Sequence, residues 1–489
     1  MSSFIYSAAK LLVSAVQFFV QDVPRAVNHA IDTYSLITPA PRWTGLEKAK
    51  HVVFINLDGI SPSQFAEMRT RSPLIDEAIS GGAISSMMLG TFPAQTSTMH
   101  VSALTGEHPR THQISRTMDY SLDEILFGDQ DKPYEDSTLN NRSDCKYKKL
   151  TDLAFKSGLI TASVGFVMSQ DDPCIYYNIP DIASTRDTGI AGCIFKKMSS
   201  IYGLKHIASG LISNVSRLSE NLSLLEIVGR LLDDSYAFAA EDAILNRKAH
   251  LTCIQQGGYD LVAHNFGTQS AEARPFLLSY QNNLERFIRA SKMAGTYNDT
   301  VFSLMSDHLI FDVNTYVYLN NLFWRNGLIR ISDRKIISCS AYGESVGKSF
   351  LIRIAADKKE STKSKVIKLL KRNQAAFGIE SVLLREDLDD LHAGTDYDLA
   401  CTAKPGVMFI HNLHPDGDIK VNDTFYKAHH GHNPRENFTT FAIWGPGIKK
   451  GIIIRDMDVV DIAPTLGHVL GLDFRCSAGR ILKVFEGEE

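Results

Sequence analysis

Six residues of metal-binding types and one hydroxyl lie far apart in the chain, each where a strand-like run gives way to a loop. They are Asp58, Asp260, His264, Asp307, His308 and His430, with Thr96 as the hydroxyl. Three carboxylates and three imidazoles are enough to bind two divalent ions. Because no thiolate is among them, the set favours catalytic Zn²⁺, although such ligands also accept Mn²⁺ and other ions.

This combination suits the cleavage of a phosphate ester. Such esters resist attack because their oxygens are anionic and their leaving groups are poor. Two divalent ions about 4 Å apart can turn an alcohol into an alkoxide and draw charge off the leaving oxygen. Thr96 would then need no histidine base, since a metal lowers its pKa. The residues therefore predict a phosphoryl-group hydrolase.

Each residue taken alone has an ordinary structural explanation. Asp58 could stabilise a turn, and Thr96 could cap a helix. Asp260 and His264 lie four apart and could form a pair on a helix surface. The adjacent Asp-His pair could end a strand, and the last histidine could lie in an exposed loop. Only the whole ordered set favours a site.

Short β-branched runs alternate with amphipathic segments, which is typical of an α/β protein. We expect strands over Val52–Leu57, Ala83–Leu89, Ile160–Phe166, His250–Ile254, Thr300–Met305 and Thr439–Trp444. We expect helices from Pro62 to about Ile79 and over Ser97–Leu104, Lys149–Lys156, Leu222–Leu245, Ser270–Ala294 and Asp458–Leu470. A central, mostly parallel sheet flanked by helices would gather the ligands at the carboxyl ends of its strands.

The strand–helix rhythm is interrupted twice, which suggests a division of the chain. The catalytic core is expected to comprise residues 50–310 and 405–489, with a helical insertion at about 169–249. Residues 311–404 are expected to form a small inserted α+β subdomain, with strands and a lysine-rich helix. Residues 1–49 are expected to form an N-terminal helical segment that packs on the enzyme body or makes weak contact with a membrane surface.

Charge and cysteine usage narrow the classes of partner and compartment. The net charge of −4 argues against a nucleic-acid polymer as partner. Seven cysteines without CxxC pairs fit reduced thiols, which favours the cytoplasm slightly. The sequence shows no clear signal peptide or membrane-spanning run. Several Asn-x-Ser/Thr triplets point weakly the other way, so the compartment stays open.

The order of these motifs resembles the type I phosphodiesterase/nucleotide pyrophosphatase family of the alkaline phosphatase superfamily. The matching segments are Leu57-Asp-Gly59, Pro93-Ala-Gln-Thr96, Leu104-Thr-Gly106, Pro109-Arg-Thr-His112, Asp260-Leu-Val-Ala-His264, Ser306-Asp-His308, His430-Gly431 and Trp444-Gly-Pro-Gly447. The resemblance covers about residues 50–487, and residues 120–245 match it poorly. It implies an alkaline-phosphatase-like fold.

The resemblance also implies a role for each candidate residue. One metal ion would be bound by Asp260, His264 and His430. The second ion would be bound by Asp58, Asp307, His308 and Thr96. Thr96 would be the nucleophile in two in-line displacements that pass through a phospho-threonine intermediate.

Two positions depart from the family pattern, and two histidines are spare. Thr117 stands where nucleotide pyrophosphatases carry an asparagine that contacts a phosphoryl oxygen, and Leu309 replaces a glycine. Neither change removes a metal ligand, but specificity for nucleotide diesters is put in question. Thr117 could still donate one hydrogen bond. His112 and His432 lie near the motifs and are candidates for substrate contact.

Several readings of the activity stay open. The expected substrate is a small phosphate ester, such as a nucleotide or a lipid headgroup. A phosphomonoesterase or phosphonate hydrolase of the same fold is the nearest alternative, and an inactive binding relative is a third. A sulfatase is disfavoured because its formylglycine motif is missing. Thr96 argues against a phosphoglycerate mutase, which uses serine.

Overall fold

The computed structural model describes residues 50–116, 121–127, 145–170, 172–179, 181, 223–333 and 335–487. The expected N-terminal helical segment, 1–49, therefore lies outside the described residues, as do Thr117 and most of the expected insertion between 182 and 222. Among the described helices, none combines the length and the apolar character needed to cross a bilayer.

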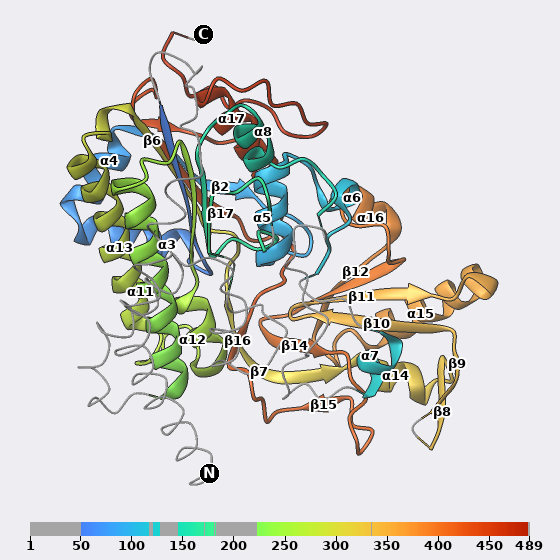
Figure 1. Cartoon of the computed structure of the whole chain (residues 1–489). Helices are drawn as coiled ribbons and strands as arrows, with labels where there is room; N and C mark the ends of the chain where they lie inside the picture. The colour runs from blue at the N-terminus through green and yellow to red at the C-terminus, as the bar shows by residue number, and fades with distance from the viewer. Residues whose placement is uncertain are drawn as a thin grey trace, which may run out of the picture.

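A nine-stranded sheet forms the centre of the molecule (Figure 1). Its strands run in the order β18-β2-β17-β6-β1-β5-β3-β4, with β19 also paired to β2. Their bounds are β1 His51–Leu57, β2 Gly82–Leu89, β3 Thr161–Val164, β4 Tyr177–Ile179, β5 Leu251–Gln256, β6 Thr300–Met305, β17 Thr439–Trp444, β18 Ile452–Ile453 and β19 Met457–Asp458. Only β17 runs antiparallel to its neighbours. The predicted mostly parallel sheet is confirmed.

Helices cover both faces of this sheet, and the alternation along β1 shows why. Val52 and Phe54 pack into the core beneath one group of helices, whereas Val53 and Ile55 pack into the core on the other face. The first group comprises α5 (Thr96–Thr105), α8 (Leu150–Lys156) and α17 (Ile462–Val469). The second comprises α3 (Pro62–Arg71), α4 (Pro73–Ser80), α11 (Leu224–Leu245), α12 (Gly258–Phe266) and α13 (Arg274–Ala294), on the left in Figure 1.

The single helix expected from Pro62 to Ile79 is in fact two helices, α3 and α4. Ser72 separates them in an extended conformation, with φ −122° and ψ 103°. A residue before proline disfavours the helical conformation, and Pro73 follows here. The Ser72 hydroxyl then accepts a hydrogen bond from Ile75 N–H, which caps the second helix.

A second group of sheets and helices lies beside the central sheet, at the lower right of Figure 1. One sheet has the order β10-β11-β13-β12, and β7 pairs with β14, β15 and β16. The strand bounds are β7 Phe311–Tyr318, β10 Ala341–Val346, β11 Ser349–Ile354, β12 Ile379–Leu383, β13 Leu399–Ala403, β14 Gly406–Ile410, β15 Lys420–Val421 and β16 Ala428–His429, beside the hairpin β8 Ile329–Ser332 and β9 Lys335–Cys339. The helices around them are α6 Pro109–His112, α7 Leu122–Phe127, α14 Leu319–Arg325, α15 Lys359–Asn373 and α16 Arg385–Asp390.

This second group has its own core, in which Val317, Phe350 and Leu399 are fully buried with Val366 of α15. We propose that it forms one unit, hereafter the second unit, made of residues 311–404 and the short strands that follow. The pairing of β14, β15 and β16 with β7 links those strands to it.

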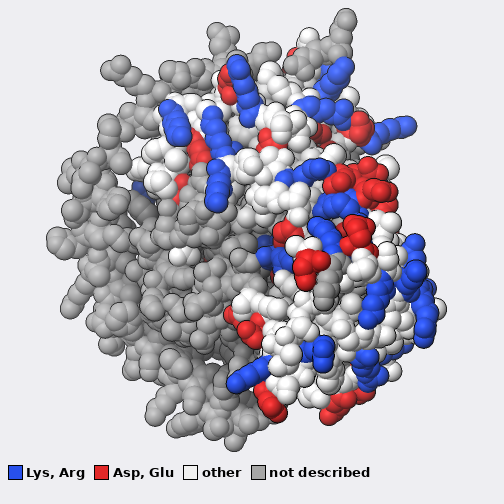
Figure 2. Space-filling model, turned by 90° about the vertical axis from the view of Figure 1, so that its right-hand side faces the viewer, with Lys and Arg blue, Asp and Glu red and all other residues white. Residues whose placement is uncertain are grey.

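Basic and acidic side chains are mixed on the face that this unit turns outward (Figure 2). Ion pairs contribute to the mixing. Lys359 Nζ lies 2.8 Å from Asp398, and both Arg116 and Arg353 contact Asp396, at 2.6 and 2.8 Å.

Removing the aromatic ring of Phe54 is expected to destabilise the central sheet. Phe54 is fully buried in a strand that has a partner on both sides. Phe54→Ala should lower the free energy of unfolding by about 3–5 kcal/mol, because it leaves a cavity. Urea unfolding followed by fluorescence would measure the change. The matched substitution Phe425→Ala, at a residue 56% exposed, should cost less than about 1 kcal/mol; equal costs would contradict the packing described.

Candidate functional site

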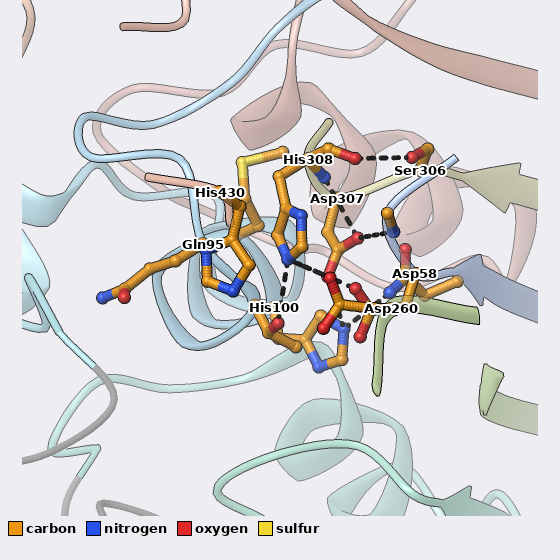
Figure 3. Close-up of polar contacts among 12 residues, drawn as sticks. Asp58, Gln95, His100, Asp260, Ser306, Asp307, His308 and His430 are labelled. Carbon is orange, nitrogen blue, oxygen red and sulfur yellow. Dashed lines mark hydrogen bonds and ion pairs between the residues drawn. The ribbon is translucent and has the colours of Figure 1, made fainter. Parts of the chain in front are cut away.

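Three carboxylates meet at one edge of the central sheet because of the order of its strands. β6, β1 and β5 are adjacent and parallel. Asp307 and Asp58 follow β6 and β1 closely, and Asp260 lies in the first turn of α12, just after β5. Carboxyl ends of parallel strands share one edge, so these side chains converge (Figure 3).

Thr96 is directed into the same cluster through His308. The Thr96 Oγ1 atom lies 3.1 Å from His308 Nε2. That nitrogen is 3.2 Å from Asp58 Oδ1 and 3.6 Å from Asp307 Oδ2. Thr96 is the first residue of α5, where backbone N–H groups lack partners within the helix. The hydroxyl, the imidazole and two acids thus form one contact group.

The remaining candidates form the other half of the cluster. Asp260 Oδ2 lies 3.2 Å from His264 Nε2, and His264 Nδ1 donates to the Ala428 carbonyl at 2.8 Å. The His430 ring lies between the two halves, with its centroid 4.0 Å from that of His308 and 5.1 Å from that of His264. The structure therefore brings all seven predicted residues together.

The loop that carries His430 is hydrogen-bonded to the segment that carries Thr96. Gly431 N donates to the Ala94 carbonyl at 2.9 Å, and Ala94 N donates to the His432 carbonyl at 3.2 Å. These two backbone bonds hold the last predicted ligand beside the predicted nucleophile, although more than 300 residues separate them in the sequence.

The donor set fits divalent metal ions. Within this cluster, three groups of residues each have ligand atoms within 4.8 Å of one another: Asp58 with Asp307 and His308; Asp260 with His308 and His430; and His264 with His429 and His430. Among the described residues, several of these atoms are buried without a hydrogen-bond partner, including Asp260 Oδ1, Asp307 Oδ2 and His430 Nδ1. Buried polar atoms rarely stay unpaired, and a cation would satisfy them.

The pKa shifts within the cluster also favour a bound cation. Burial, followed by repulsion from Asp307 and Asp260, holds the pKa of Asp58 well above its usual range. Burial also raises the pKa of Asp307 and lowers that of His430. Neutral imidazole is the form that binds a metal, and a bound cation would offset the repulsion among the acids.

In the pair formed by Asp260 and His264, each residue favours the charged form of the other. Burial is the largest influence on Asp260 and would raise its pKa, but attraction and hydrogen bonding to His264, together with attraction to His308 and His429, lower it. Burial opposes the charge on His264, and attraction to Asp260 raises its pKa in return.

Buried amides beneath the cluster orient Asp58, and the sequence analysis did not find them. Gln255 Nε2 donates to Asp58 Oδ2 at 2.6 Å. Asn56 Nδ2 donates to Gln255 Oε1 at 2.7 Å and lies 3.1 Å from His100 Nε2. The available signal was the presence of polar residues inside apolar strands, at the ends that face the site. Such groups fix the direction of a ligand.

A second supporting residue, Asp233 of α11, fixes the start of α12. Its Oδ1 atom accepts hydrogen bonds from Gly257 and Gly258 N–H, at 3.2 and 2.9 Å. A Cβ atom on Gly258 would lie only 2.4 Å from Asp233 Oδ2, so this close approach requires glycine. Asp260 is two residues further on. Asp233 therefore positions the helix that carries two predicted ligands.

The candidate substrate contacts have different surroundings. His112 is buried, its Nδ1 atom accepts from Ile114 N–H at 3.0 Å, and its Nε2 atom lies 2.9 Å from Ser102 Oγ. Both nitrogens are thus used within the fold. His432 is also buried, with Nε2 at 3.2 Å from the Asn437 carbonyl. Leu309 is buried as well.

Solved structures show which fold this chain shares. Murine ectonucleotide pyrophosphatase/phosphodiesterase 5, as an inactive threonine-to-alanine variant in complex with AMP, is 14% identical; its TM-score is 0.58, with 88% of this chain and 98% of that chain covered. The human counterpart is 15% identical, with a TM-score of 0.58 and coverages of 88% and 97%. No curated protein sequence matches the chain. The chain has the same alkaline-phosphatase-like fold.

The family follows from the sequence match. The sequence model of the type I phosphodiesterase/nucleotide pyrophosphatase family matches residues 52–433. The chain belongs to this family, as its motifs indicated. The match spans every predicted ligand and the second unit up to β16.

The buried acid Asp233 predicts a dependence of stability on pH. Burial raises its pKa from 3.8 to about 8, so the folded chain keeps a proton that the unfolded chain loses. The stabilising contribution of that proton is complete below about pH 4 and is lost as pH rises through about 8.

Asp233→Asn, which cannot ionise, should therefore unfold at higher denaturant concentration than the wild type at pH 9, with little difference at pH 4. Denaturant titrations at both pH values would measure this. Asp416→Asn, at an exposed residue outside α11, is the control and should keep the wild-type profile. An identical pH profile for Asp233→Asn would contradict the assignment.

Proposed function

We propose that this protein is a metal-dependent hydrolase of phosphodiesters or pyrophosphates that uses Thr96 as its nucleophile. This proposal rests mainly on one contact group. In it, Thr96 Oγ1 lies 3.1 Å from His308 Nε2, and the same nitrogen lies 3.2 Å from Asp58 Oδ1. Membership of the phosphodiesterase/pyrophosphatase family supports this reaction class. The murine relative, inactive as a threonine-to-alanine variant, supports a threonine nucleophile.

Two divalent ions, with Zn²⁺ favoured, would complete the site. Asp260, His264 and His430 would hold the first ion. Asp58, Thr96, Asp307 and His308 would hold the second ion. When bound, such ions lower the pKa of the attacking hydroxyl and neutralise charge on the phosphoryl and leaving oxygens.

The protein's own residues would orient the phosphoryl group and supply the attacking oxygen. The N-terminus of α5 presents backbone N–H groups to the phosphoryl oxygens, since the Gln95 side chain does not cap it and instead donates to the Ser115 carbonyl at 3.0 Å. The Thr96 hydroxyl gives its proton to solvent as the Oγ–P bond forms and the bond from phosphorus to the leaving oxygen breaks. The leaving group takes up a proton from solvent and departs as the first product. In the second displacement, water attacks the phosphorus and the Thr96 Oγ–P bond breaks. This step restores the Thr96 hydroxyl and releases the phosphate product.

A small nucleotide-type ester is the proposed substrate, because the family acts on such compounds and the murine relative is in complex with AMP. The asparagine of nucleotide pyrophosphatases is replaced by Thr117. One hydroxyl would then contact the phosphoryl oxygen in place of an amide. A panel of diester and monoester substrates tests this preference directly.

Thr96→Ala is expected to lower kcat by about 10³-fold or more, because the nucleophile is lost. Metal content and the unfolding midpoint should stay as in the wild type, since the other ligands remain. Thr96→Ser keeps a hydroxyl and should retain measurable turnover. Hydrolysis of bis-p-nitrophenyl phosphate would provide the rate. Full activity in Thr96→Ala would refute the nucleophile.

Removal of metal is expected to abolish hydrolysis, and Zn²⁺ should restore it. The acids of the cluster would be left without a counter-charge, so the apo protein should also unfold at lower temperature. Dialysis against a chelator, followed by stepwise return of Zn²⁺, would measure both effects. Comparison of bis- and mono-p-nitrophenyl phosphate would separate a phosphodiesterase from a phosphomonoesterase. Activity that is indifferent to chelators would overturn the mechanism.

A further inference from the structure

One imidazole beside the cluster has no role in the proposed mechanism. His429 precedes His430 and ends the short strand β16. Its ring centroid lies 4.5 Å from that of His264 and 4.8 Å from that of His430. A possible ligand atom of His429 lies within 4.8 Å of the ligand atoms of both residues. The His429 ring is thus closer to each of these two predicted ligand rings than they are to each other, at 5.1 Å.

The hydrogen bonds of His429 leave one ring nitrogen for a metal. The Nδ1 atom accepts a hydrogen bond from His430 N–H at 3.0 Å. A nitrogen that accepts carries no proton, so in the neutral ring the proton is on Nε2. A divalent ion binds the ring nitrogen that has no proton, so binding at Nε2 would select the other neutral tautomer, in which Nδ1 carries the proton and lies 3.4 Å from the His430 carbonyl oxygen. Nε2 is therefore the nitrogen available to a metal.

The turn between β10 and β11 fixes this ring in place. At Gly347, φ is +59°, and a Cβ atom there would lie 2.2 Å from His429 Nδ1 and 2.4 Å from the His430 carbonyl oxygen. Only glycine allows so close an approach at this φ. The next residue, Lys348, donates its N–H to that carbonyl at 2.9 Å. The second unit thus holds His429 against the cluster.

We propose that His429 is an additional ligand of the first metal ion, beside Asp260, His264 and His430. This inference rests on the proposed function, which supplies the metal. The first site would then offer three imidazoles and one carboxylate. The second site would offer two carboxylates, one hydroxyl and one imidazole. The two ions would therefore differ in their surroundings, one being rich in nitrogen and the other in oxygen.

This difference determines which metal each site prefers. Imidazole suits Zn²⁺, whereas carboxylate and other oxygen ligands also suit Mn²⁺ and Mg²⁺. The first site should therefore retain Zn²⁺ under conditions in which the second exchanges it for Mn²⁺. His429 would therefore increase the difference in metal preference between the two sites.

The test compares His429→Ala with the wild type by metal titration and metal analysis. Wild-type protein should bind two equivalents of Zn²⁺ and, after dialysis against excess Mn²⁺, keep one of them. His429→Ala should bind the first equivalent at least about tenfold more weakly and lose zinc in the same dialysis. The second site should be unchanged. His392→Asn, which removes an exposed imidazole elsewhere, is the matched control and should behave as the wild type.

X-ray absorption at the zinc edge of wild-type protein with one equivalent of Zn²⁺ provides a second readout that needs no substitution. Three imidazoles are expected around the ion; two would refute the inference. Unchanged zinc retention in folded His429→Ala would also refute it, while leaving the proposed function intact. Wild-type protein that binds no metal would instead overturn the proposed function.

Discussion

The mutual repulsion of three carboxylates, two of them buried and one partly buried, is the constraint on which this site depends. Asp58, Asp260 and Asp307 share one sheet edge because β6, β1 and β5 are adjacent and parallel. Burial removes the water that would otherwise screen them, so their charges act strongly on one another. Such an arrangement is costly without cations, and the unpaired oxygen atoms of the cluster show where cations would be held.

The surrounding structure supports this costly arrangement with further polar groups that hydrogen-bond to the ligands or to the elements that carry them. Asn56 and Gln255 form a chain of amide hydrogen bonds that ends on Asp58. Asp233 holds the first turn of α12, and the Ala428 carbonyl fixes the ring of His264. Partners of this kind fix the rotamers and tautomers of ligands before a metal arrives. The site is thus built as much by α11 and β16 as by the strands that precede its ligands.

Much of the fold and the cluster could be predicted because the responsible patterns are local. The sequence alone reveals the apolar run of β1 with Asp58 directly after it. It also reveals the four-residue spacing of Asp260 and His264. The break at Ser72 was missed because a periodic apolar pattern outweighed the effect of a single proline. Gln255 and His429 were missed because their roles come from contacts with residues more than 75 positions away, which no local pattern encodes.

The glycine turn between β10 and β11 has a consequence for how this enzyme family can diversify. Gly347 and Lys348 contact the loop of His430, and that loop is hydrogen-bonded to Ala94, two residues before the proposed nucleophile. A change in substrate range through remodelling of the second unit must therefore preserve this turn. Loops elsewhere in the unit are free of that requirement, so evolutionary variation should accumulate there while the turn keeps its length.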